Sequence, residues 1–245
     1  HIFMRRAIEL AAGGFGRVSP NPAVGAVLVC GGEVVAEGFH PQWGGDHAEV
    51  VALREAREKG FSRFPDSSLY VSLEPCSSVG KTPACTDAIL EHGVGEVVFA
   101  VSDPDPRHRG NGGDVLSEHG VAVRSGVLEE DARYLIRGFE TYLRSGRPWI
   151  IAKAGMTLDG RITLPDGEGQ WITSTEARHD AMKLRREVDA IVVGAGTLIA
   201  DDPSLTVRDS SGIAAGCQPL RVVLAGSKEL PQERALFTDS FSDRT

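Results

Sequence analysis

The chain alternates short apolar runs with amphipathic segments, and this pattern predicts the elements of an α/β protein. Residues 23–30 form an apolar run, Gly31 and Gly32 make a tight turn, and residues 33–39 alternate, which is typical of a β-hairpin. The same pattern predicts further strands at 69–73, 96–101 and 121–124 and helices at 4–12, 47–59, 82–91 and 131–144. Alternation of strands with helices along a chain favours the α/β class.

A second series of elements follows the turn-rich sequence 145–148, which we interpret as a domain boundary. The series comprises predicted strands at 149–154, 190–194 and 220–225 and a helix at 175–187. We therefore expect one domain over residues 1–146 and a second over residues 147–245, because domains usually run to roughly 100–200 residues.

Composition and charge narrow the classes of function. The 245 residues are 41% hydrophobic and carry a formal net charge of −8, whereas nucleic-acid binding depends on neutralising phosphates with Lys and Arg. No stretch approaches the roughly 18 apolar residues of a membrane span, and no signal-peptide pattern opens the chain. We expect no nucleic-acid or membrane partner and a reducing, cytoplasmic setting, in which cysteines bind metal or stay free.

One group of residues has the pattern of a catalytic zinc site. His47 and Glu49 fall in the first turn of a predicted helix, Cys76 follows a strand, and Cys85 falls in the first turn of the next helix. A catalytic zinc ion takes three protein ligands and leaves its fourth position to water, and a neighbouring carboxylate can act as the general base. His-x-Glu followed by Pro-Cys is the signature of the zinc base deaminases, although eight residues separate the cysteines here instead of two.

Two simpler interpretations of these residues stay open. The cysteines could be core residues beside a surface histidine, although the order of the residues and the presence of Glu49 argue against this. A purely structural zinc ion would need a fourth protein ligand. Cys30, within a strand, and Cys217, in a later loop, are not obvious candidates for it.

Longer motifs resemble the bifunctional deaminase–reductase family of riboflavin biosynthesis. In the first half these are Ser19-Pro20-Asn21-Pro22-Ala23-Val24-Gly25, His47-Ala48-Glu49-Val50, Glu74-Pro75-Cys76 and Gly80-Lys81-Thr82-Pro83-Ala84-Cys85. In the second half they are Leu158-Asp159-Gly160-Arg161, Gln170-Trp171-Ile172-Thr173-Ser174 and Ala200-Asp201-Asp202-Pro203. The resemblance implies an α/β protein with an N-terminal cytidine-deaminase-like α/β/α domain, followed by part of a dihydrofolate-reductase-like α/β reductase domain.

The resemblance also implies substrates, cofactors and residue roles. The expected substrate is a phosphoribosylaminopyrimidine, deaminated with zinc in the first domain and reduced with NADPH in the second. Glu49 is then the catalytic residue and His47, Cys76 and Cys85 are the zinc ligands. The other expected contacts are Asn21, His40, Lys81, Arg185, Leu205 and Arg208 with substrate, and Lys153, Gly155, Trp171, Thr197 and Asp201 with NADPH.

The chain also departs from this family's pattern. Ser78 stands where the family usually has a substrate-contacting histidine, and Gly169 stands where it often has a substrate-binding serine. The family's reductase needs roughly a hundred further residues, about the length of a small domain. We therefore expect a truncated chain with an incomplete NADPH site, and open sheet edges that favour a homo-oligomer.

Two other functions stay open on the sequence. The chain could be a nucleoside, nucleotide or tRNA deaminase with an unrelated tail, or a non-catalytic protein with a structural zinc ion. Metal analysis coupled to ammonia release on each type of substrate would distinguish them.

Overall fold

The computed structural model describes residues 1–106, 108–162, 171–209 and 211–245. It divides into two units, His1–Ile150 and Ile151–Thr245.

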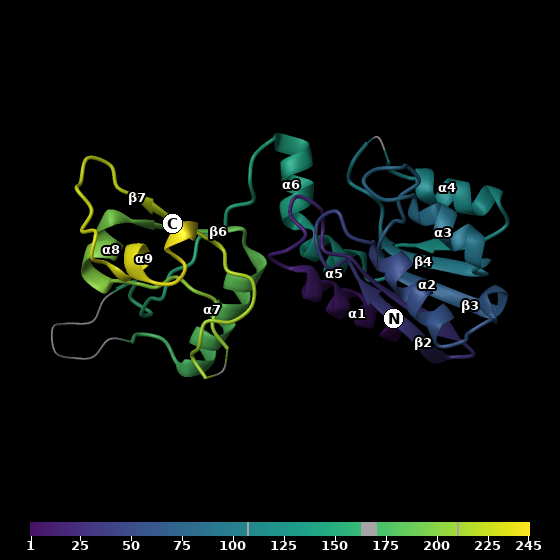
Figure 1. Ribbon diagram of the computed structural model, residues 1–245, viewed down its shortest axis with the longest axis horizontal. Helices are drawn as coiled ribbons and strands as arrows, with labels where there is room; N and C mark the ends of the chain where they lie inside the picture. The colour runs from purple at the N-terminus through teal and green to yellow at the C-terminus, as the bar shows by residue number, and fades with distance from the viewer. Residues whose placement is uncertain (107, 163–170, 210) are drawn as a thin grey trace. The chain divides into compact units, whose positions relative to one another are not determined.

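A five-stranded mixed sheet forms the centre of the first unit (Figure 1). Its strands are β1 (Gly25–Cys30), β2 (Glu33–Phe39), β3 (Ser67–Leu73), β4 (Glu96–Val101) and β5 (Ala122–Ser125), in the order β2-β1-β3-β4-β5. β1 is antiparallel to both of its neighbours, whereas β3, β4 and β5 are parallel. The carboxyl ends of β3 and β4 therefore meet at one edge of the sheet, and Cys76 follows β3 there.

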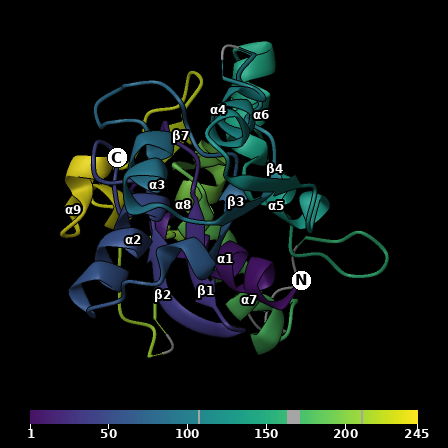
Figure 2. The same ribbon diagram turned by 90° about the vertical axis from the view of Figure 1, so that its right-hand side faces the viewer.

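Helices cover both faces of this sheet, as Figures 1 and 2 show. On one face, α2 (Ala48–Glu58), α3 (Cys85–His92) and α4 (Asn111–Glu118) contribute to a core with Leu28, Val71 and Phe99 of the strands. On the other face, α1 (Ile2–Ala11) and α5 (Glu129–Leu135) pack on Val27 and Val98. Side chains alternate between the two cores along each strand because the strand period is two residues. The unit is completed by α6 (Arg137–Ser145) and the short 3₁₀ helices Ala12–Gly14 and Phe64–Asp66.

The approach of α2 to the sheet depends on Gly38 of β2. A Cβ atom at this position would lie 2.4 Å from the backbone oxygen of Ala48, the first residue of α2. Only a glycine lets the helix start this close to the strand, because any side chain would meet its backbone. His47 and Glu49 flank that contact, so the strand fixes how far the start of α2 stands from the sheet.

The predicted strands of the first unit are confirmed, with ends that differ by one or two residues. The helix expected at 131–144 is instead two helices, α5 and α6, that break at Ile136, whose backbone is not helical (φ −99°, ψ 11°). The helix expected from Thr82 and Pro83 starts later, at Cys85, because the segment before it belongs to the loop that returns to Cys76. α4 was not predicted, since its first turn, Asn111-Gly112-Gly113, is typical of a loop.

The second unit contains α7 (Thr175–Glu187), β6 (Ala190–Gly194), α8 (Ala195–Asp201), β7 (Leu220–Leu224), α9 (Ala235–Thr238) and the 3₁₀ helix Ser242–Arg244. β6 and β7 are parallel and pair residue for residue from Ala190 with Leu220 to Gly194 with Leu224. Leu198, Leu205 and Leu236 form its buried core. The helix expected at 175–187 and the strands at 190–194 and 220–225 are confirmed.

The strand expected at 149–154 is wrong for this structure. These residues form no strand, and Ile150 is 80% exposed. A strand requires a neighbour for its backbone groups, and β6 and β7 pair only with each other in the described part of the chain.

The described helices also lack the length and apolar character to span a bilayer.

Candidate metal centre

Three side chains from separate elements converge at the carboxyl edge of the first sheet. His47 Nδ1 lies 3.1 Å from Cys85 Sγ and 3.6 Å from Cys76 Sγ, and the two sulfur atoms are 3.4 Å apart. The three residues can offer one ligand atom each to a single metal ion. The structure thus brings together the three residues that the sequence predicts as metal ligands.

The secondary structure places each of these residues at the end of an element. His47 is the N-cap of α2, Cys76 follows β3 after Glu74 and Pro75, and Cys85 is the first residue of α3. The backbone N–H of Cys85 donates a hydrogen bond to Cys76 Sγ over 3.3 Å. The positive end of the α3 dipole also favours a thiolate at this point.

The spacing of the three ligand atoms fits a tetrahedral zinc ion. Bonds of about 2.3 Å to sulfur and about 2.0 Å to nitrogen would set the sulfurs about 3.8 Å apart and nitrogen about 3.5 Å from sulfur. The separations of 3.1–3.6 Å lie within a few tenths of an ångström of these values. Two thiolates and one imidazole are a donor set that zinc prefers.

The electrostatics of the triad favour a charged sulfur. Hydrogen bonding from Cys85 and from His47 lowers the pKa of the Cys76 thiol to about 4. The hydrogen bond to Cys76 in turn raises the pKa of His47. The hydrogen bond with Cys76, together with burial, raises the pKa of Cys85 above its ordinary value. The two thiols therefore lose their protons as an interacting pair, and a bound cation would favour both thiolates.

Glu49 lies in the first turn of α2, two residues after His47, and is only 3% exposed. Burial raises the pKa of its carboxyl group to about 7. A carboxyl group that titrates near neutral pH can both accept and return a proton, as a general acid–base catalyst must.

Asn21 and His40 form a second polar pair in this unit. His40 Nδ1 lies 2.9 Å from the backbone oxygen of Asp46, so this nitrogen carries the proton and donates it. His40 Nε2 is then the acceptor for the Asn21 amide nitrogen, 3.3 Å away. Burial lowers the pKa of His40, which agrees with a neutral ring. The rings of His40 and His47 pack edge to face with centroids 5.1 Å apart, so the pair adjoins the metal triad.

The loop between the two cysteines carries Lys81 and Ser78. Lys81 Nζ lies 3.3 Å above the ring of Trp43, a residue that the sequence did not single out. Ser78 Oγ lies 3.3 Å from Nδ1 of His108, in the loop after β4. His108 was also missed, because nothing in its local sequence marks it as a neighbour of residue 78.

In the second unit the structure brings together the residues expected to contact substrate. Arg185 donates to the backbone oxygen of Thr206 over 2.9 Å, and Arg208 Nε donates to the Thr206 hydroxyl over 3.2 Å. Arg208 also donates to the hydroxyl of Ser204. Leu205 lies between Ser204 and Thr206 in the sequence. It is buried and has a left-handed backbone (φ 51°). Burial and the nearby Arg208 charge lower the pKa of Arg185, so two cations converge on one segment.

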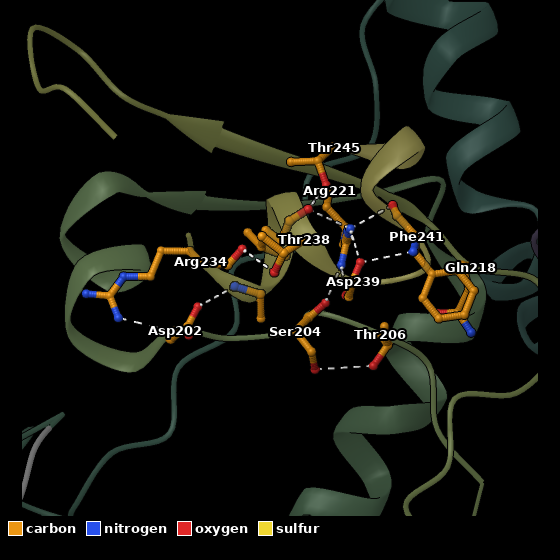
Figure 3. A network of polar contacts seen from close by, with 12 residues as sticks. Asp202, Ser204, Thr206, Gln218, Arg221, Arg234, Thr238, Asp239, Phe241 and Thr245 are labelled. Atoms are coloured by element: carbon orange, nitrogen blue, oxygen red, sulfur yellow. Dashed lines mark hydrogen bonds and ion pairs between the residues drawn. The ribbon is translucent and has the colours of Figure 1, made fainter. Parts of the chain in front are cut away.

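The buried Arg221 joins the segment 204–208 to residues 236–241, as Figure 3 shows. The Arg221 guanidinium donates to both carboxylate oxygens of Asp239, over 2.7 and 2.9 Å. It also donates to the backbone oxygens of Ser204, Leu236 and Phe241. Arg221, another residue that the sequence did not indicate, therefore joins the segment of Leu205 and Arg208 to α9 and the residues after it.

The expected NADPH contacts fall in two groups: one on α8, and one made of Lys153, Gly155 and Trp171, which precede α7 in the sequence. Thr197 and Asp201 are exposed on α8. Lys153 and Gly155 lie outside any helix or strand, and a Cβ atom at Gly155 would lie 3.4 Å from Thr173. Trp171 is 62% exposed, with the Arg178 guanidinium 4.8 Å from its ring. In the ranges that the structure describes, no hydrogen bond or ion pair joins the two groups, and Gly169 lies outside those ranges.

Comparison with known protein families defines the class of each half. Residues 1–101 match the cytidine and deoxycytidylate deaminase zinc-binding region, and residues 148–244 match the RibD C-terminal domain. The first match covers the metal triad and Glu49. The chain thus combines a zinc-binding deaminase domain with a reductase-type domain, and the second match excludes a tail unrelated to riboflavin biosynthesis proteins.

The chain belongs to the RibD family of riboflavin biosynthesis deaminase/reductases. It is 44% identical to RibD of Aquifex aeolicus over 94% of this chain and 45% identical to RibD of Escherichia coli over 84%. A solved Thermotoga maritima diaminohydroxyphosphoribosylaminopyrimidine deaminase/5-amino-6-(5-phosphoribosylamino)uracil reductase superposes with a TM-score of 0.86 at 44% identity, covering 97% of this chain and 66% of that one. The chain spans 62% of the length of the Aquifex protein and 55% of the Escherichia coli protein.

Proposed function

We propose that this chain catalyses the zinc-dependent hydrolytic deamination of 2,5-diamino-6-(5-phosphoribosylamino)pyrimidin-4-one, an intermediate of riboflavin biosynthesis. The observation that carries the proposal is the triad of His47, Cys76 and Cys85 with the buried Glu49 two residues from its histidine. The reaction replaces the exocyclic amine of the pyrimidine ring by an oxygen from water and releases ammonia. The match to the deaminase zinc-binding region supports the same reaction class.

His47, Cys76 and Cys85 would hold the zinc ion, which supplies Lewis acidity to activate water for attack on the ring carbon. Glu49 accepts the first proton that this water loses and delivers it to the ring nitrogen. It then takes the second proton of the same water, from the hydroxyl group newly formed on the ring carbon, and delivers it to the amine, which departs as ammonia. Burial raises the pKa of the Glu49 carboxyl group, which helps it to hold each proton between the two transfers.

Asn21, His40 and Lys81 are the proposed substrate contacts of this half. Because His40 occupies the Asn21 amide nitrogen, the Asn21 carbonyl oxygen is the atom left to accept a hydrogen bond from the ring's amine groups. Lys81 lies on the loop between two zinc ligands and supplies a cation for the substrate phosphate.

The second half supports a domain of the reductase type, which in the full-length family acts on the ribosyl group with NADPH. The supporting observation is that Arg185 and Arg208 both hydrogen-bond to Thr206. Two guanidinium groups on one residue are a charge arrangement suited to a phosphate. Lys153, Gly155, Trp171, Thr197 and Asp201 remain the proposed cofactor contacts. A homo-oligomer and a cytoplasmic setting also remain predictions; exposed apolar side chains on β6 and β7, such as Val192 and Leu224, favour self-association.

The test is zinc analysis combined with ammonia release on three substrates: the diaminopyrimidine phosphoribosylamine, cytidine and deoxycytidylate. We expect about one zinc ion per chain and turnover of the first substrate alone. Turnover of cytidine or deoxycytidylate instead would assign the chain to nucleoside or nucleotide deamination. Bound zinc without ammonia release from any of the three would indicate a structural metal.

A further inference from the structure

The carboxylate of Glu74 binds four backbone N–H groups of another part of the first unit. Glu74 directly follows β3 and is only 3% exposed. Its Oε2 accepts from the N–H groups of Asp103 and Gly110, over 3.1 and 3.0 Å. Its Oε1 accepts from those of Gly112 and Gly113, over 3.1 and 3.2 Å. A single side chain thus binds Asp103 and Gly110, at the two ends of the loop between β4 and α4 (the β4–α4 loop), and also the start of α4.

This contact supplies a cap that α4 does not provide for itself. The N-cap residue of α4 is Gly110, which has no side chain to accept from the helix. The first N–H groups of a helix lack partners within it, and a carboxylate suits the positive end of its dipole. Glu74 therefore binds the start of α4 from the neighbouring strand.

Gly112 shows independently how close this packing is. A Cβ atom at Gly112 would lie 1.9 Å from the backbone oxygen of Pro75. The first turn of α4 therefore rests directly on the residue that precedes the metal ligand Cys76. A shift of α4 would therefore also shift the segment that carries Cys76.

The β4–α4 loop carries His108 to the segment that holds this ligand. His108 Nδ1 lies 3.3 Å from Ser78 Oγ, and Ser78 is only two residues beyond Cys76. The His108 backbone N–H donates to the oxygen of Asp105 over 3.0 Å, so the residue is fixed within the same loop. The mechanism above uses neither Glu74 nor His108.

We propose that Glu74 is a positioning residue of the deaminase. Its carboxylate holds the β4–α4 loop against the metal-ligand segment and thereby places His108 beside Ser78, where the imidazole contacts the bound pyrimidine substrate. The inference rests on the proposed deaminase function and adds one wall to its substrate site. Glu74 itself contacts neither metal nor substrate.

Glu74→Gln tests the anchor, with Glu96→Gln as its matched control. A glutamine keeps the shape but presents an NH₂ group where two N–H donors need an acceptor. Glu96 begins β4, at the other end of the strand, where it accepts from Ser68 over 2.6 Å and pairs with Arg124. We expect Glu74→Gln to keep its zinc and to lower kcat/KM by about tenfold to hundredfold, mostly through KM, because the substrate contact is misplaced. Glu96→Gln should leave KM unchanged.

Two further readouts separate positioning from a general loss of stability. Hydrogen exchange of the Gly110, Gly112 and Gly113 amides should accelerate in Glu74→Gln and not in Glu96→Gln. His108→Ala should raise KM in the wild-type chain but add little in the Glu74→Gln chain, because the histidine is already displaced there. An unchanged KM in Glu74→Gln, unchanged amide protection, or fully additive effects of the two substitutions would each overturn the proposal.

A pair of glycine variants tests the same contact if Glu74→Gln does not fold. Gly112→Ala would force α4 away from Pro75, whereas Gly113→Ala would place its Cβ 3.4 Å from the Phe99 ring, an ordinary contact. Gly112→Ala should raise KM more than Gly113→Ala, and equal values would contradict the proposal. A wild-type chain that releases no ammonia would instead refute the proposed function, whatever the amide exchange shows.

Discussion

Lys81 Nζ lies 3.3 Å above the ring of Trp43, so the loop between the cysteine ligands is held against the segment that precedes α2. A cation over an aromatic ring gains roughly 0.5–1 kcal/mol at an exposed site. The contact confines the ammonium group beside Trp43 without neutralising its charge, which leaves it able to bind a substrate phosphate.

Lys81→Ala should therefore raise KM for the phosphorylated substrate while changing kcat little. A phosphate contact remote from the reacting carbon binds the ground state and the transition state alike. Steady-state kinetics of ammonia release at low ionic strength would measure this. Lys59→Ala, which removes an exposed lysine paired with Glu55 on α2, is the control. Equal KM values in the two variants would mean that Lys81 does not bind the phosphate.

Glu49→Gln should keep the zinc ion and lower kcat by about 100-fold or more. Glu49 is not a ligand, and general acid–base catalysis contributes about 100-fold to 10,000-fold to rates. Zinc content and ammonia release measured on the same preparation would test both parts. Glu58→Gln, at the exposed end of the same helix, should behave as wild type. Full deaminase activity in Glu49→Gln would disprove the proposed proton transfers.

Cys85→Ser and Cys76→Ser should lose the zinc ion, whereas Cys30→Ser should keep it. Cys30 lies at the end of β1 and is not part of the triad. Removing one of three protein ligands weakens zinc binding, and chelation should then lower the stability of the wild-type chain but not of Cys85→Ser. Zinc analysis and thermal unfolding with and without a chelator would show this. Retention of zinc in both triad variants would place the metal elsewhere.

Asp239→Asn should destabilise the second unit by about 3 kcal/mol, because it removes the charge partner of a buried guanidinium. The Arg221 side chain is 1% exposed and its hydrogen bonds hold the pKa of Asp239 below its ordinary value. Since the folded-state pKa is the lower one, the ion pair stabilises the fold above the unfolded pKa of about 3.9, and this contribution is lost as the pH falls through the folded value.

Urea unfolding of the wild type, Asp239→Asn and the control Asp243→Asn at pH 7 and at acid pH would test that prediction. The wild type should lose more stability on acidification than Asp239→Asn, since the variant has no carboxylate to protonate. Asp243 is exposed in the last 3₁₀ helix, so its variant should follow the wild type. Identical acid dependence of all three chains would mean that the Arg221–Asp239 pair contributes nothing to stability.

The sequence was sufficient for the elements whose local signals agree with the fold. The alternating pattern and the Gly31-Gly32 turn predicted the hairpin, and the motif around His47, Glu49, Cys76 and Cys85 predicted residues that the structure brings together. These signals are local or belong to a known motif. The roles expected for the other substrate and cofactor contacts stay predictions.

The features that the sequence did not predict depend on contacts between distant segments. α4 starts at a glycine pair that by itself indicates a loop, and its cap comes from Glu74, more than thirty residues earlier along the chain. The expected strand at 149–154 has an apolar pattern but no described partner for its backbone. In both cases the outcome depends on the hydrogen-bond partner that the folded chain offers, which periodicity does not report.

The contact between Gly38 and α2 has a consequence for how variants of this protein should be interpreted. Gly38 is on an edge strand and takes no part in metal binding, yet any larger residue there would move the helix start that carries both His47 and Glu49. A screen for lost activity would therefore identify residue 38 alongside the ligands themselves. Variants at this position would lose activity because the distance between the sheet and α2 changes. Compensating substitutions in α2, rather than at the metal ligands, would then restore their activity.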